Sequence, residues 1–218
     1  EVATMKIVVF TGAGVSADSG IPTYRSSDGL WAKHKIEDVC TPEALVRDRA
    51  KVINFYNMRR REMAGKLPNA GHRAIAELEQ LFDVEVITQN IDNLHEQAGS
   101  TKITHLHGEL TKLRSSENPD LIVEIGLRNQ ELDEVAEDGS PLRPHIVFFG
   151  EAVPMFDRAR ELVQQADILV IVGTSLAVYP AASLVYFVRN EQIPVYLVDP
   201  GTPDTSMIRN PLTHIKER

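Results

Sequence analysis

Short runs of β-branched and other apolar residues recur along the whole chain, and each is bounded by residues that favour turns. Runs with so few polar positions are typical of strands buried on both faces of a sheet. We therefore expect a parallel sheet with helices covering both sides. The runs comprise residues 6–10, 84–88, 103–106, 145–149, 167–172 and 194–198.

Helical patterns lie between these runs. Apolar side chains at helical spacing form one face in each of two segments, residues 71–82 (Ile75, Leu78, Leu81 and Phe82) and 157–166 (Ala159, Leu162, Val163 and Ala166). The alternation of strand and helix predicts an α/β fold with a Rossmann-like, doubly wound parallel sheet.

Two stretches interrupt the alternation. Residues 30–68 have a helical pattern, whereas residues 111–143 are polar and rich in turn residues. We expect both to pack together as a smaller, mainly helical second domain. The Rossmann-like domain then consists of residues 1–29, 69–110 and 144–218.

The composition excludes several classes of protein. The 218 residues carry 23 basic and 31 acidic side chains, and the net charge of −8 disfavours non-specific binding to nucleic acid. The single cysteine, Cys40, cannot form an internal disulfide. No apolar run approaches the ~20 residues that span a bilayer, and no signal peptide is recognisable at the N-terminus. We expect a cytoplasmic protein that binds neither nucleic acid nor membrane.

The first run leads into a glycine-rich turn, Gly12-Ala13-Gly14, that fits the pattern G-x-G-x-x-A. Such a turn lets a backbone approach a pyrophosphate, but tight glycine turns after strands are also common without a ligand. The acidic residue that usually binds the ribose about 20 residues later is absent. Asp199, at the end of the last run, is a candidate substitute, and its alternative role is to start a Val-Asp-Pro-Gly turn.

The chain continues as SGIPTYRSSDGLW over residues 19–31, where it resembles the sirtuin family of NAD-dependent protein deacylases. Their signature is GAGxSxxSGIPxFR followed by DGLW, and Tyr24 stands where Phe is commoner. Four more blocks match in order: TQNIDNLH at 88–95, LHGE at 106–109, RPHIVFFGE at 143–151 and GTSLAV at 173–178.

The resemblance implies an NAD site and a catalytic loop. In the family, the acyl oxygen of a modified lysine attacks the ribose carbon that loses nicotinamide. It implies that Asn90 and Asp92 hold nicotinamide and ribose, and that His107 is the general base. Without the matching blocks, turn chemistry would be the favoured explanation of the Asn/Asp pair. The implied cofactor-binding residues are Gly12, Ala13, Gly14, Ser16, Tyr24, Arg25, Gln89, Asn90, Ile91, Asp92, Gly173, Thr174, Ser175 and Asp199.

A substrate site is implied as well. Val147, Phe149, Gly150 and Glu151 match the strand that the family pairs with an extended peptide bearing the acyl-lysine, and Val178 matches the opposing segment. Backbone pairing of this kind gives affinity with little sequence preference. Core packing is the alternative for the Val and Phe residues, and we expect Phe148 to face the core.

Tyr56 and Arg59 lie three residues apart in a helical segment and so project from one face. A tyrosine hydroxyl and a guanidinium can together bind a carboxylate. The alternative is a solvated basic face, since Arg59 begins a run of three arginines. The pair matches the Tyr-x-x-Arg motif of class III sirtuins, which implies removal of succinyl and malonyl groups in addition to acetyl.

The chain departs from the family in one respect. Many sirtuins carry a four-cysteine zinc site in the small domain, but residues 111–143 contain no cysteine. We therefore expect no zinc and no other metal. Two alternatives to a deacylase are a protein mono-ADP-ribosyltransferase of the same fold and a non-catalytic nucleotide-binding module, and the presence of His107 argues against the second.

Overall fold

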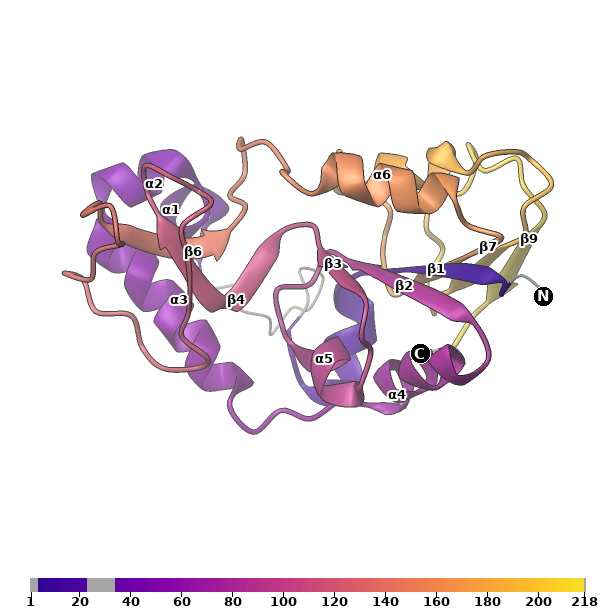
Figure 1. The fold of residues 1–218 in the computed structure, drawn as a ribbon, viewed down its shortest axis with the longest axis horizontal. Coiled ribbons are helices and arrows are strands. Elements are labelled where there is room, and N and C mark those ends of the chain that lie inside the picture. The colour runs from indigo at the N-terminus through magenta and orange to yellow at the C-terminus, as the bar shows by residue number, and fades with distance from the viewer. Residues whose placement is uncertain (1–3, 23–33, 218) are drawn as a thin grey trace.

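A computed structural model describes residues 4–22 and 34–217. Its main feature is a parallel sheet of six strands in the order β3-β2-β1-β7-β8-β9 (Figure 1). This confirms the predicted Rossmann-like, doubly wound sheet. The strands are β1 (Lys6–Thr11), β2 (Asp83–Thr88), β3 (Ile103–His105), β7 (Ile168–Val172), β8 (Val195–Val198) and β9 (Leu212–Ile215).

Helices cover both faces of this sheet, with α6 (Phe156–Gln164) on one side and α4 (Ala70–Glu77) and α5 (Leu94–Ala98) on the other (Figure 1). Val8 and Phe10 of β1 belong to the core cluster that contains the buried residues of α6. Ile7 and Val9, which alternate with them, belong to the cluster on the α4 side. Burial on both faces explains why residues 7–10 are all apolar.

The two predicted helices differ in outcome. In α6 the residues Ala159, Leu162 and Val163 are fully buried, as predicted. The helix predicted over residues 71–82 was wrong at its C-terminal end. The α-helix α4 stops at Glu77, and a 3₁₀ turn, η3 (Leu78–Gln80), follows. Leu81 is consequently 77% exposed instead of facing the core.

A second group of elements lies beside the sheet (Figure 1). Its helices are α1 (Ile36–Val39), α2 (Pro42–Arg47) and α3 (Arg49–Met63), and its strands β5 (Ile122–Glu124), β4 (Gly108–Ser115) and β6 (Leu142–Ile146) form an antiparallel sheet in that order. The helices were predicted and this sheet was not. A cluster containing Phe55, Tyr56, Leu110 and Phe148 packs α3 against the sheet.

The run at 145–149 was misassigned to the parallel sheet, because its strand residues pair with β4 instead. Strands β4 and β6 also run across residues 110/111 and 143/144, where the domain boundaries were predicted. The division into two domains therefore stays a prediction. In the described part of the chain, no helix is both long and apolar enough to cross a membrane.

Candidate active site

The carboxyl ends of four parallel strands bring distant sequence blocks together. Strand β1 lies between β2 and β7, and its last residue, Thr11, pairs with Thr88 and Val172. From β1 the chain continues to β2 on one side, and after β3 it crosses to β7 on the other side of β1. The carboxyl end of β1 is therefore the topological switch point of the sheet, where open α/β sheets bind ligands. The blocks that meet there begin at Gly12, Gln89, Gly173 and Asp199.

The glycine-rich turn after β1 packs directly on the turn after β7. The Gly12 N–H donates to the carbonyl of Val172 at 3.0 Å and the Gly14 N–H to that of Gly173 at 2.8 Å. A Cβ atom on Gly12 would lie 2.7 Å from the Gly173 oxygen, and one on Gly14 would lie 2.8 Å from the Gly173 Cα. Close packing of the two turns therefore excludes side chains at these positions.

The short helix η1 (Ala13–Ser19) and the loop after β2 share a buried hydrogen-bond network. The Asn90 amide donates to the Gly12 carbonyl at 2.9 Å, and the Ser16 hydroxyl donates to Asp92 Oδ2 at 2.8 Å. The Leu94 N–H donates to Asp92 Oδ1 at 3.0 Å. Ser16, Asn90 and Asp92 are each less than 10% exposed. The structure thus brings these three predicted residues into one cluster.

Gln89 and Thr174 connect this loop to the turn after β7. The Thr174 hydroxyl donates to Gln89 Oε1 at 2.9 Å, and the same hydroxyl oxygen accepts the Leu176 N–H at 3.2 Å. Two blocks that the sequence analysis treated separately are therefore joined by one hydrogen bond.

His107 follows β3 and faces the same loop. Its Nδ1 lies 3.2 Å from the carbonyl oxygen of Gln89. Because a carbonyl only accepts, Nδ1 carries the proton and Nε2 keeps a free lone pair in the neutral ring. Burial lowers the pKa of His107 below its ordinary value of 6.5. His107 is therefore a neutral base at physiological pH, as the predicted role requires.

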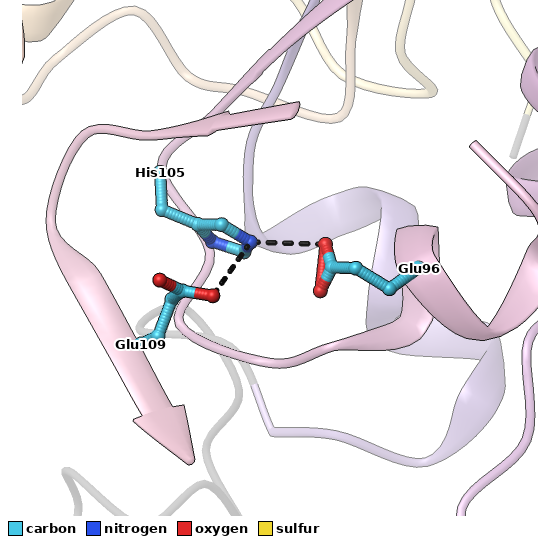
Figure 2. A group of neighbouring side chains, drawn as sticks. All are labelled: Glu96, His105 and Glu109. Carbon is cyan, nitrogen blue, oxygen red and sulfur yellow. Dashed lines mark hydrogen bonds and ion pairs between the residues drawn. The ribbon is translucent and has the colours of Figure 1, made fainter. Parts of the chain in front are cut away.

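His105, two residues earlier, is in the opposite state (Figure 2). Its Nδ1 lies 2.9 Å from the Asn90 carbonyl, and its Nε2 lies 3.0 Å from Glu96 Oε1 and 3.8 Å from Glu109 Oε1. Both nitrogens face acceptors, so both carry protons. Burial disfavours the charged ring, but the contacts with Glu96 and Glu109 outweigh it and raise the pKa of His105. A protonated histidine cannot serve as a base, and the sequence did not reveal this ion pair.

Tyr56 and Arg59 lie on α3. Tyr56 is 1% exposed, and its ring stacks on that of Phe148 at a centroid distance of 5.8 Å. Arg59 is half-buried and lines a small cavity with residues 20–22, which directly follow the short helix η1. The arginine run is not a uniform solvated face, because Arg60 is fully buried and only Arg61 is exposed.

The segment after β6 forms a turn instead of the predicted strand. The Glu151 carboxylate accepts two bonds from Arg143, both at 2.8 Å, and one from the Phe148 N–H at 2.7 Å. These bonds fold residues 148–151 back and end the strand at Ile146. Phe148 is buried, as predicted, while Phe149 and Gly150 are exposed. Val147 and Val178 are half-buried.

Comparisons with known proteins decide the family. The sequence model of the Sir2 family matches residues 12–180. The chain belongs to the Sir2 family. An NAD-dependent protein deacylase of Aggregatibacter actinomycetemcomitans is 57% identical over 207 residues, which cover 94% of this chain and 97% of the relative.

Solved structures agree with this assignment. A Sir2 homologue mutant in complex with ADP-ribose superposes with a TM-score of 0.88 at 37% identity, over 98% of this chain and 86% of the other. A Sir2 mutant with a deacetylated p53 peptide and 3′-O-acetyl ADP-ribose has a TM-score of 0.81 at 29% identity, over 98% and 89% of the two chains.

Two predicted NAD-site residues of this Sir2 chain, Tyr24 and Arg25, lie outside the described residues. Asp199 is 6% exposed, and its Oδ1 accepts the Gly201 N–H at 2.7 Å. The turn considered for Asp199 as an alternative is therefore formed. A ribose contact by this carboxylate stays a prediction, as do the contacts of Ala13, Ile91 and Ser175.

One group in the described part of this Sir2 chain, Glu96, His105 and Glu109, has ligand atoms close enough to hold a metal ion, all within 4.8 Å of one another (Figure 2). Glu96 is paired with His105 at 3.0 Å, and Glu109 is paired with Lys112 at 2.7 Å. Each carboxylate thus already has a cationic partner, which explains the group as an ion-pair network. The group also lies outside residues 111–143, which contain no cysteine.

Proposed function

We propose that this chain is an NAD-dependent protein-lysine deacylase, which transfers the acyl group of a modified lysine to ADP-ribose and releases nicotinamide. The observation that carries the proposal is His107, a buried neutral histidine whose Nε2 is available as a base beside the Gln89–Asp92 loop. The names of the relatives and the nucleotide complexes of the structural neighbours support the same activity.

The residues present fit NAD. Tight glycine turns at the switch point bring backbone amides to the edge of the sheet, and the donor set beside them contains a carboxamide, Asn90, and a carboxylate, Asp92. Bound NAD supplies a ribose carbon that becomes electrophilic as nicotinamide leaves. Asn90 and Asp92 would orient the nicotinamide and ribose of bound NAD and would stabilise the positive charge that develops at this carbon.

His107 completes the reaction by accepting a proton from a ribose hydroxyl at Nε2. The Gln89 carbonyl holds the ring in the tautomer that has this lone pair. Burial keeps the ring neutral near pH 7, so the base is ready before substrate binds. His105, which is protonated and committed to Glu96, does not compete for the role.

The substrate is an acyl-lysine in an extended peptide. The backbone N–H groups of Val147, Phe149 and Glu151 already donate to the carbonyls of His107, Cys40 and Phe148. Val147, Phe149, Gly150, Glu151 and the opposing Val178 would therefore pair with the peptide through their remaining backbone groups. The Glu151 carboxylate is held by Arg143, so this residue contributes its backbone.

The acyl group includes succinyl and malonyl in addition to acetyl. Tyr56 packs against Phe148, directly before the exposed turn, and Arg59 lies one helical turn further along α3. Burial raises the pKa of the Cys40 thiol, while a hydrogen bond from Tyr56 and the charge of Arg59 both lower it. A carboxylate that reached both the Tyr56 hydroxyl and the Arg59 guanidinium would receive charge-assisted hydrogen bonds.

A panel of otherwise identical acetyl-, malonyl- and succinyl-lysine peptides tests the proposal. With NAD, mass spectrometry should detect the free lysine peptide and the matching acyl-ADP-ribose for all three. A peptide or protein that gains the mass of ADP-ribose would instead identify a mono-ADP-ribosyltransferase. Turnover of the acetyl peptide alone would refute the acyl preference and leave the deacylase intact.

A further inference from the structure

One carbonyl of the loop after β2 is held by a charged side chain. The Asn90 carbonyl accepts from His105 Nδ1 at 2.9 Å. The carbonyl before it accepts from His107 Nδ1, and the carbonyl after it accepts the Leu110 N–H. In the described part of the chain, His105 is the one donor to the Asn90 carbonyl. The segment from β3 into β4 therefore holds three successive carbonyls, and His105 holds the middle one.

Asn90 is also held at its backbone N–H and at its side chain. The N–H donates to the Thr88 hydroxyl at 3.1 Å, and the side-chain amide donates to the Gly12 carbonyl at 2.9 Å. A carboxamide that is to orient nicotinamide needs a backbone fixed in this way. Resting on the function proposed above, we propose that His105 is a positioning residue: its doubly protonated ring fixes the Asn90 backbone, and turnover falls at high pH when the ring loses one proton.

The ring of His105 lies between two carboxylates, Glu96 of α5 and Glu109 of β4 (Figure 2). Its Nε2 lies 3.0 Å from Glu96 Oε1 and 3.8 Å from Glu109 Oε1. The His105 side chain is 8% exposed. Burial lowers the pKa of His105, but Glu96 and Glu109 outweigh this effect and raise the pKa above 6.5. The geometry therefore favours a ring that keeps both protons, one for each nitrogen.

Other titratable neighbours do not change this balance. Lys112 is paired with Glu109 at 2.7 Å. Burial lowers the pKa of His95 to about 3 and that of His145, which lines the same cavity as His105, to about 4. Both rings are therefore neutral at physiological pH. Among the histidines of this cluster, only His105 can lose a proton at alkaline pH.

Loss of one proton changes what the ring offers to Asn90. The remaining proton has two competing acceptors, the Asn90 carbonyl and the Glu96 carboxylate. A charged acceptor forms the stronger hydrogen bond, so the proton stays on Nε2. The bare Nδ1 then faces the carbonyl oxygen, and two acceptors 2.9 Å apart repel each other. The loop is released at the residue that is to orient nicotinamide.

Two replacements of His105 separate its donor from its charge. In His105→Asn the side-chain nitrogen takes the position of Nδ1, because both atoms are bonded to Cγ, and this nitrogen donates without titrating. In His105→Leu no donor remains. With NAD and an acetyl-lysine peptide, we expect His105→Leu to lower kcat by up to about 10²-fold across the pH range. His105→Asn should retain most of the kcat at neutral pH and should lose the fall at alkaline pH.

Glu96→Gln tests the charge that keeps the ring protonated. Without this carboxylate, the alkaline fall in kcat should begin about one pH unit or more lower. The acid limb should stay in place, because burial and the Gln89 carbonyl set the pKa of His107. Glu124→Gln, which removes a carboxylate from the exposed strand β5, is the matched control and should move neither limb.

Nitrogen NMR of the His105 ring gives a direct readout. Loss of its proton should coincide with the alkaline limb of kcat, both in the wild type and in Glu96→Gln. Melting temperatures show which variants fold, and the pH profiles of His105→Asn and Glu96→Gln provide the test if His105→Leu does not. An alkaline limb that persists in His105→Asn, or one that does not move in Glu96→Gln, would overturn the inference. If kcat follows the melting temperature through all variants, His105 serves only the fold.

The proposed function is judged separately from this inference. A wild type that deacylates no peptide with NAD would refute the function itself. A wild type that is active, with a pH profile that none of the His105 and Glu96 variants alters, would refute the inference alone.

Discussion

Two histidines that lie two residues apart have opposite protonation states, because their partners differ. His107 has one acceptor at Nδ1 and is neutral, whereas His105 has acceptors at both nitrogens and is charged. Burial alone would make both neutral. The carboxylates of Glu96 and Glu109 make the difference, and they leave His107 as the base of the pair.

Replacing His107 with alanine should lower deacylation by about 10²–10⁴-fold, the usual contribution of a general base. NAD binding, measured by calorimetry, should persist because the glycine turns and the Gln89–Asp92 loop are unchanged. In the wild type, the acid limb of kcat/KM should have an apparent pKa below 6.5, since burial lowers the pKa of this ring and only the neutral form accepts a proton. Near-wild-type turnover of His107→Ala would remove His107 from the mechanism.

Replacing Arg59 with methionine should weaken desuccinylation by roughly 1.5–3 kcal/mol in kcat/KM, the value of a hydrogen bond to a charged group. Deacetylation should be spared, because an acetyl group offers no carboxylate. Arg61→Met is the matched control on the same helix, since Arg61 is exposed and bonded to Asn129. Equal losses of both activities in Arg59→Met would show that Arg59 serves the fold.

At the scale of elements, the end of β6 depends on one ion pair. Arg143 is 8% exposed, its guanidinium lies 4.4 Å from the centre of the Phe148 ring, and both of its terminal nitrogens bind Glu151. The same carboxylate accepts the Phe148 N–H. The exposed turn that is proposed to pair with the peptide is therefore fixed from its buried side.

Glu151→Ala should lower the free energy of unfolding by about 3 kcal/mol at pH 7, because it leaves a buried guanidinium unpaired. Glu151→Gln should cost less, since its oxygen can still accept the Phe148 N–H. Burial raises the pKa of Glu151, but the bonds from Arg143 and Phe148 outweigh it and hold the pKa below 4.5. The stabilisation is therefore complete above the unfolded pKa and is lost as the pH falls through the folded value. Urea unfolding at pH 7 and pH 3 measures this, and an equal cost at both would contradict it.

The sequence predicted the elements that are buried on both faces and missed those that are not. The strands β1, β7 and β8 lie within apolar runs with one interpretation, and β2 was recognised from its β-branched residues although it contains Asp83 and Glu85. The strands β4, β5 and β9 carry charged or exposed residues. All of β5 is exposed, for example, so hydrophobic pattern could not identify it.

The candidate site shows the same limit. The glycine turn, the loop at 89–92 and His107 were predicted, because each is a local block of sequence. The ion pair of His105 was not, because its partners come from other elements. The Asn90 carbonyl, for example, precedes His105 by 15 residues. Only folding brings these partners together.

At the scale of the whole molecule, two groups of elements meet beside the carboxyl edge of the parallel sheet (Figure 1). The second group is held together by packing of α3 on β4 and β6, and by hydrogen bonds such as that from Arg60 Nε to the Leu110 carbonyl at 2.8 Å. Leu113 and Leu142 join β4 and β6 in a further buried cluster. That this group of elements needs no metal stays a prediction.

Treatment with a chelator should accordingly change neither the melting temperature nor the deacylase activity. Elemental analysis of the purified protein should find no stoichiometric zinc, because thiolate ligands are absent from residues 111–143. Zinc at one equivalent, or a melting temperature that falls on chelation, would contradict this and direct attention to Glu96, His105 and Glu109.

The most direct measurement of the central claim is the stoichiometry of the reaction. Purified protein, NAD and one succinyl-lysine or acetyl-lysine peptide are incubated, and nicotinamide, free lysine peptide and acyl-ADP-ribose are quantified together by mass spectrometry. Transfer of the acyl group to ADP-ribose, with His107 as the base, predicts equal amounts of the three products and their loss in parallel in His107→Ala. Deacylation that proceeds without NAD, or nicotinamide release without acyl-ADP-ribose, would contradict the account.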